Sequence, residues 1–142
     1  MTGRGDVVGA ELVRNPDVVK ISFTGSVSLG KSIMRDGATT MKRVTLELGG
    51  KSPNILLDDA DLTKAIPNAL VIGFLNSGQA CDAGARLLVP KNRLDEVKRA
   101  ILDAMPAFPV GDPADRKTAI GPMVTQKQYE RVQSYIRFLR GS

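Results

Sequence analysis

The single cysteine, Cys81, is the strongest nucleophile that the sequence offers. One cysteine cannot form an internal disulfide, and without histidine the chain lacks the ligands of a zinc cluster, so we expect no metal site. The lack of histidine also excludes a Cys–His dyad within the chain. Cys81 is therefore either a small core residue, which is the usual case, or a thiol that backbone N–H groups or a carboxylate activate.

A glycine-rich stretch is the second candidate for chemistry. Residues 25–32, GSVSLGKS, fit the pattern G-x-x-x-x-G-K-[ST] between a predicted strand and a predicted helix, which is the context of a phosphate-binding loop. In that interpretation Lys31 reaches a terminal phosphate, Ser32 reaches magnesium, and Asp58 helps to hold the metal. A plain Gly-Ser turn before a helix stays open as the alternative, because such turns are common.

Alternating helices and strands are expected to position these residues. Runs of β-branched and apolar residues predict strands at residues 18–24, 43–48, 53–57 and 85–89. Apolar residues at helical spacing predict helices at residues 6–14, 28–35, 94–105 and 126–139, with a further helix that acidic residues 58–61 cap and that runs to residue 75. The alternation indicates an α/β fold with at least some parallel strand pairing.

Size, composition and charge exclude several classes of protein. The 142 residues are 42% hydrophobic and 25% charged, which suits one globular unit with its own core. No apolar run approaches a membrane span or a signal peptide, so we expect no membrane contact and a cytoplasmic location. The net charge of +5 is scattered among acids, and aromatic residues make up 4% of the chain, so we expect no nucleic-acid partner.

Two further blocks change the interpretation of the glycine-rich stretch. Residues 43–55, RVTLELGGKSPNI, and residues 74–81, FLNSGQAC, resemble the glutamate and cysteine motifs of the NAD(P)+-dependent aldehyde dehydrogenase superfamily. Residues 23–30, FTGSVSLG, are similar to the pyrophosphate loop of that family. Three blocks in this order are far more specific than one eight-residue pattern, so the nucleotide triphosphatase becomes the weaker alternative.

The resemblance implies a reaction and two catalytic residues. Cys81 would add to an aldehyde to give a thiohemiacetal, which loses hydride to become a thioester, and its backbone N–H would donate to the oxyanion. Glu47 would be the general base for the water that releases the carboxylic acid. Family members that pass the acyl group to coenzyme A generally lack this glutamate, so Glu47 favours hydrolysis.

The resemblance also implies a cofactor, NAD or NADP, and a small-molecule aldehyde as substrate. Gly25, Ser26 and Gly30 would bind the pyrophosphate of the dinucleotide. Leu48 would lie against the nicotinamide, and Gly49 would let the backbone pass close to it. These five residues and the two catalytic residues complete the expected site.

By this resemblance the chain is α/β, with parts of two domains of the aldehyde dehydrogenase fold truncated at both ends. Residues 1–49 would be the C-terminal half of a Rossmann-like dinucleotide-binding domain, and residues 50–142 the N-terminal half of the catalytic domain. The family's Pro-Trp-Asn and Glu-x-Phe-Gly-Pro motifs have no counterpart here. We therefore expect the isolated chain to be inactive, and a non-catalytic binding or structural module is the alternative function. The resemblance also implies a homo-oligomer for the parent enzyme.

Overall fold

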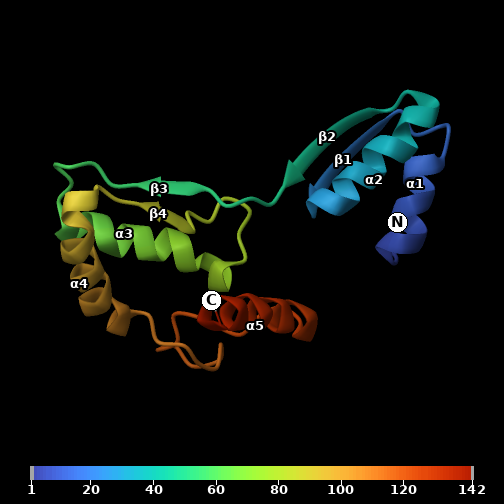
Figure 1. The fold of residues 1–142 in the computed structure, drawn as a ribbon. Helices are drawn as coiled ribbons and strands as arrows, with labels where there is room; N and C mark the ends of the chain where they lie inside the picture. The colour runs from blue at the N-terminus through green and yellow to red at the C-terminus, as the bar shows by residue number, and fades with distance from the viewer. Residues whose placement is uncertain (1, 142) are drawn as a thin grey trace. The chain divides into compact units, whose positions relative to one another are not determined.

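The computed structural model describes residues 2–141, and the chain separates into two compact units, Met1–Gly50 and Lys51–Ser142. Figure 1 shows their helices and strands. The division falls one residue after the domain boundary expected from the sequence. That the two units are halves of a dinucleotide-binding domain and of a catalytic domain stays a prediction.

The first unit is built around two parallel strands. β1 (Lys20–Gly25) pairs with β2 (Arg43–Leu48) from Lys20↔Arg43 to Gly25↔Leu48, which confirms the expected parallel pairing. The helical segments are η1 (Gly5–Gly9), α1 (Ala10–Arg14), α2 (Val27–Gly37) and η2 (Ala38–Thr40). Because parallel strands need a crossover connection, the β1–α2–β2 order follows from the pairing.

Helix α2 packs on one face of this strand pair, and two glycines allow a close approach. A Cβ atom on Gly30 would lie 3.0 Å from a methyl group of Leu48, and one on Gly37 would lie 3.7 Å from a methyl group of Val44. Successive side chains of a strand point to opposite faces, so Val44, Leu46 and Leu48 line the face toward α2. Ile33 of α2 is buried there.

A buried lysine fastens the connection between α1 and β1 to the start of β2. Lys42 is 9% exposed, and its Nζ donates hydrogen bonds to the backbone carbonyl oxygens of Asn15 and Val18. The Asn15 carbonyl also accepts from the Val18 N–H at 3.2 Å, so Lys42 adds a second hydrogen bond to it. An apolar residue in place of Lys42 would remove both of its hydrogen bonds.

The second unit also contains two parallel strands, which lie alongside helix α3 (Figure 1). β3 (Pro53–Ile55) pairs with β4 (Arg86–Leu88) in the register Pro53↔Arg86 to Ile55↔Leu88. The helices of this unit are α3 (Leu62–Phe74), η3 (Leu75–Gly78), η4 (Lys91–Arg93), α4 (Leu94–Ala104), η5 (Met105–Ala107) and α5 (Gln126–Gly141).

Helices α3 and α4 enclose the core of the second unit. Ile66 is fully buried, and Leu56, Leu70 and Val97 are buried beside it. The ring of Phe74 at the end of α3 meets the ring of Phe108 edge to face, with 5.5 Å between the ring centroids. This core fixes the last turn of α3, from which the segment that carries Cys81 departs.

The start of α3 is capped as the acidic residues before it predict. The Asp61 carboxylate accepts hydrogen bonds from the Thr63 N–H at 3.0 Å and the Thr63 hydroxyl at 2.7 Å. The Lys64 Nζ lies 3.2 Å from the Asp61 Oδ2. These contacts hold the pKa of Asp61 below its ordinary value, with the Thr63 side chain as the largest cause. Pro67 lies inside the helix, past the first turn. Among residues 2–141, no helix is both long and apolar enough to cross a membrane.

Candidate active site

The residues expected to bind the dinucleotide gather at the carboxyl ends of β1 and β2. Gly25 is the last residue of β1 and pairs with Leu48, the last residue of β2. Ser26 and Gly49 follow directly, and both are exposed. In open α/β sheets, ligands bind outside the carboxyl ends of the strands, so four of the five expected residues stand where such a ligand is recognised.

Ser26 is the N-cap of helix α2, since its hydroxyl accepts a hydrogen bond from the Leu29 N–H at 3.3 Å. The first N–H groups of a helix have no partner within it and carry partial positive charge, which suits an anion. Gly30 is different, because its N–H donates to the Ser26 carbonyl at 2.9 Å and its Cα faces Leu48. The structure thus gives Gly30 a packing role, and its contact with pyrophosphate stays a prediction.

The alternative of a triphosphatase loop at residues 25–32 is wrong for this structure. Only Ser26 separates β1 from α2, so no extended loop is present to wrap a phosphate group. Lys31 and Ser32 lie within α2, and the Ser32 hydroxyl donates to the Ser28 carbonyl at 3.3 Å. Asp58 is in a turn after β3 rather than at the end of a strand. Residues 25–32 match the pattern of a phosphate-binding loop, but helix α2 begins at Val27 and leaves no loop to bind a phosphate.

Glu47 projects from the face of the strand pair opposite α2. It is exposed and stands beside Thr24 of β1, while its neighbour Leu48 is half-buried on the helix side. This arrangement makes Glu47 available to a proton-bearing group, and its catalytic role stays a prediction.

Cys81 is exposed, and it lies in a turn between η3 and β4. The chain just before it has an unusual backbone: Asn76, Ser77 and Gly78 have φ angles of 49°, 60° and 72°. Left-handed conformations are unfavourable for residues other than glycine and persist where the surroundings hold them. The thiol is therefore presented by a sharply turned segment and is not part of the core, so the core-residue interpretation of Cys81 is wrong.

Two side chains that the sequence analysis did not single out connect this segment to a distant loop. The Ser77 hydroxyl donates to the Gly121 carbonyl at 2.9 Å, and the Gln79 carboxamide oxygen accepts from the Val124 N–H at 3.0 Å. The Gln79 amide group also donates to the Asn76 carbonyl at 2.9 Å. No periodicity or local motif could have identified these contacts, because they join residues 44 and 45 positions apart.

On the other side of Cys81 the chain enters the protein interior. Ala83 and Gly84 are buried, and a Cβ atom on Gly84 would lie 3.0 Å from a methyl group of Ile72 and 3.2 Å from the Asn54 Cβ. Only glycine fits between α3 and β3 at this point without a shift of its neighbours. The cysteine turn is thus anchored on both sides by the second unit.

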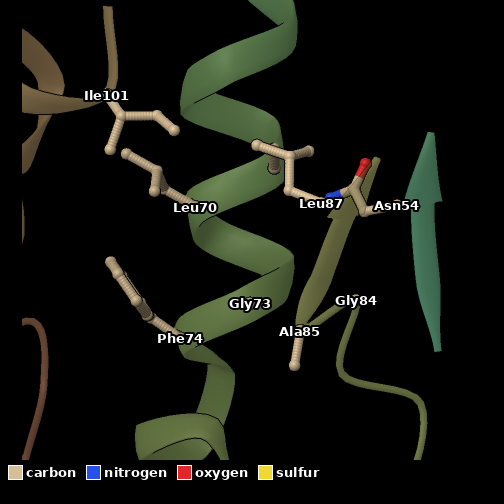
Figure 2. Close-up of a pocket in the computed structure, with 9 residues that line it drawn as sticks. Asn54, Leu70, Gly73, Phe74, Gly84, Ala85, Leu87 and Ile101 are labelled. Atoms are coloured by element: carbon tan, nitrogen blue, oxygen red, sulfur yellow. The ribbon is translucent and has the colours of Figure 1, made fainter. Parts of the chain in front are cut away.

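A pocket of about 230 Å³ lies beside Gly84 (Figure 2). Leu70 and Phe74 of α3, Leu87 of β4 and Ile101 of α4 form its apolar wall. Asn54 also lines it, and its buried Nδ2 has no hydrogen-bond partner among the described residues. Cys81 does not line this pocket.

Within residues 2–141, no three side chains of His, Cys, Asp or Glu gather closely enough to hold a metal ion.

Comparison with known proteins places the chain in one family. The family model described as the aldehyde dehydrogenase family matches residues 1–140. A 3-succinoylsemialdehyde-pyridine dehydrogenase from a Pseudomonas species is 47% identical over 137 residues, which cover 96% of this chain and 29% of that protein.

Solved structures agree with this assignment. A mutant of aldehyde dehydrogenase C from Pseudomonas syringae, in complex with NAD+ and octanal, matches with a TM-score of 0.91 and 43% identity over 96% of this chain and 28% of that one. An NADP-dependent enzyme from E. coli matches with a TM-score of 0.91 and 41% identity, over 96% and 28% of the two chains.

These comparisons confirm the expected α/β fold and the resemblance that the glutamate and cysteine blocks indicate. The chain spans less than a third of the length of these relatives. With a family model that matches almost every residue, the chain belongs to the aldehyde dehydrogenase family.

Proposed function

We propose that this chain carries the nucleophile, the general base and part of the dinucleotide site of an enzyme that oxidises an aldehyde to a carboxylic acid with NAD or NADP. The observation that carries the proposal is the exposed Cys81 on a turn anchored on both sides, in a chain without histidine. A thiol with this exposure is open to a carbonyl compound, and the family uses aldehydes. The cytoplasmic location expected from the sequence stays a prediction.

The residues at the carboxyl ends of β1 and β2 fit a dinucleotide. Gly25, Ser26 and Gly49 are exposed there, and the N-terminus of α2 offers N–H donors to a pyrophosphate. Leu48 supplies an apolar surface beside them. The nicotinamide would supply the chemistry of a hydride acceptor when bound. Solved relatives contain NAD+ or are described as NADP-dependent, and both cofactors are proposed for this chain.

The protein's own part of the reaction is nucleophilic and acid–base chemistry. The Cys81 thiolate attacks the carbonyl carbon, a C–S bond forms, and the carbonyl π electrons move to the oxygen, to which the Cys81 N–H donates. After oxidation the acyl group is held as a thioester on Cys81. Glu47 then takes a proton from water, the water oxygen bonds to the acyl carbon, and the C–S bond breaks to release the acid and the thiolate.

The test uses an activated ester, which acylates a cysteine without any hydride acceptor. With p-nitrophenyl acetate, we expect the wild-type chain to release p-nitrophenol slowly and the variant Cys81→Ala to lose this activity completely. Iodoacetamide should add one group to the native wild-type chain and none to the variant, as intact mass measures. Labelling of Cys81 only after denaturation would contradict the proposal.

Glu47 is tested in the same assay. If it is the general base, Glu47→Gln should keep the first acylation of Cys81 and slow the steady release by about 10²-fold or more. Glu130→Gln changes another exposed glutamate in the same way and serves as the control.

We expect no NADH from the chain alone at saturating NAD+, since it spans under a third of the length of its relatives. Cysteine-dependent NADH formation would contradict that expectation.

A further inference from the structure

The turn before Cys81 has a backbone conformation that its own residues do not favour. Asn76 and Ser77 both have positive φ angles although neither is glycine, and Gly78 continues the same conformation. Such residues keep this geometry only where other contacts determine it. The Gln79 N–H donates to the Asn76 carbonyl at 3.1 Å, which closes the turn but does not fix its position on the second unit.

Three side-chain hydrogen bonds provide that position, and we name them the turn latch. Two of them reach the loop before α5: Ser77 Oγ to the Gly121 carbonyl, and the Val124 N–H to Gln79 Oε1. The third, from Gln79 Nε2 to the Asn76 carbonyl, braces the Gln79 carboxamide. Ser77 and Gln79 are half-buried, and the bond from Ser77 to Gly121 is partly buried, so water competes less for it than for the two exposed bonds of Gln79.

We propose that Ser77 and Gln79 are positioning residues for the reaction of Cys81. The inference rests on the proposed function, in which Cys81 is the nucleophile and its N–H an oxyanion donor. Gln79 is two residues before Cys81, and the chain after Cys81 is confined at Gly84 between Ile72 and Asn54. The latch therefore fixes the middle of the segment between Phe74 and Gly84, and with it the direction of the Cys81 N–H and thiol.

Positioning matters more for acylation than for alkylation. Attack on an ester places charge on an oxygen that a correctly directed N–H must stabilise, and misdirection of one such donor costs up to about 10²–10³-fold in rate. Alkylation by iodoacetamide develops no oxyanion and needs only an exposed thiolate. The ratio of the acylation rate to the alkylation rate of Cys81 thus measures orientation, independently of the amount of reactive thiol.

The test compares Gln79→Ala and Ser77→Ala with the wild-type chain. We expect either variant to lower the ratio by about tenfold, and Gln79→Glu, which keeps an acceptor for the Val124 N–H, to recover part of it. Gln126→Ala and Ser134→Ala remove comparable side chains whose hydrogen bonds stay within α5, and they should leave the ratio unchanged. Ser77→Ala alone decides the question if Gln79→Ala does not fold.

Amide hydrogen exchange, followed by NMR, tests the latch without any chemistry at Cys81. The Val124 N–H should exchange faster in Gln79→Ala than in the wild type or in Gln79→Glu. A lower melting temperature with an unchanged ratio of acylation to alkylation would show that Ser77 and Gln79 are structural residues only, and would overturn the proposal. An unchanged exchange rate of the Val124 N–H in Gln79→Ala would overturn it as well. If the wild-type thiol is alkylated but never acylated, the proposed function fails, and the exchange measurement alone decides whether the latch exists.

Discussion

The two units hold their candidate residues by different means. In the first unit, Gly25 and Leu48 are placed by backbone pairing between β1 and β2, and Ser26 by its cap of helix α2. In the second unit, the turn at Cys81 depends on side chains that reach residues 121–124. A site held by regular backbone structure tolerates changes in single side chains, whereas a turn held by three side-chain bonds loses its position when one of them is removed.

The largest expected effect concerns the core that supports the cysteine turn. Ile66→Ala should lower the free energy of unfolding of the second unit by about 2–5 kcal/mol, because Ile66 is fully buried and its removal leaves a cavity under α3. Urea unfolding measures the change. Ile55→Ala, at a residue that is 61% exposed, is the matched control and should cost less than about 0.5 kcal/mol. Equal losses in the two variants would contradict the core described for this unit.

A second prediction tests whether the close packing of α2 on β2 stabilises the first unit. Gly30→Leu should cost about 1–3 kcal/mol, since even a Cβ atom at this position would lie 3.0 Å from Leu48 and the larger side chain would force α2 away from β2. Gly9→Leu also changes a helical glycine, but a Cβ atom there meets nothing within 4 Å. Thermal unfolding of the two variants should therefore differ, and similar melting temperatures would disprove the close packing.

The smallest expected effect compares two left-handed residues, one in each unit. Met41 has a φ of 54° and is 88% exposed, so Met41→Gly should stabilise the protein by up to about 1 kcal/mol by removing the backbone strain. Ser77→Gly relieves the same strain but loses the hydrogen bond to Gly121, worth about 1 kcal/mol, and should bring no net gain. Urea midpoints decide the comparison. If Ser77→Gly raised the free energy of unfolding as much as Met41→Gly, the hydrogen bond from Ser77 to Gly121 would not be a stabilising contact.

Local patterns in the sequence predicted the regular elements closely. The alternation of Val44, Leu46 and Leu48 with polar residues predicted a strand at residues 43–48, and β2 has these bounds. The predicted strand at residues 53–57 is shorter in the structure, where β3 ends at Ile55. Helix α3 begins after its acidic cap and ends at Phe74, one residue earlier than predicted, because Leu75 starts the turn toward Asn76.

The sequence also determined the family, since the glutamate and cysteine blocks stand in the order that the family model matches. These blocks made the triphosphatase the weaker interpretation of residues 25–32, but they did not show where the helix after Gly25 begins. The structure decided this by starting α2 at Val27, directly after a Ser26 cap. A helix cap is a single hydrogen bond that spans three residues. The sequence of residues 25–32 is compatible with its presence or its absence.

The sequence by itself thus determined what is encoded within one element: the strand pattern of β2, the capping carboxylate of Asp61 and the single thiol of Cys81. Only the tertiary structure decided that this thiol is exposed and that Ser77 and Gln79 reach residues 121–124. The physical reason is distance along the chain. A hydrogen bond between residues more than 40 positions apart depends on how α3, α4 and the loop before α5 pack, and no local pattern records that packing.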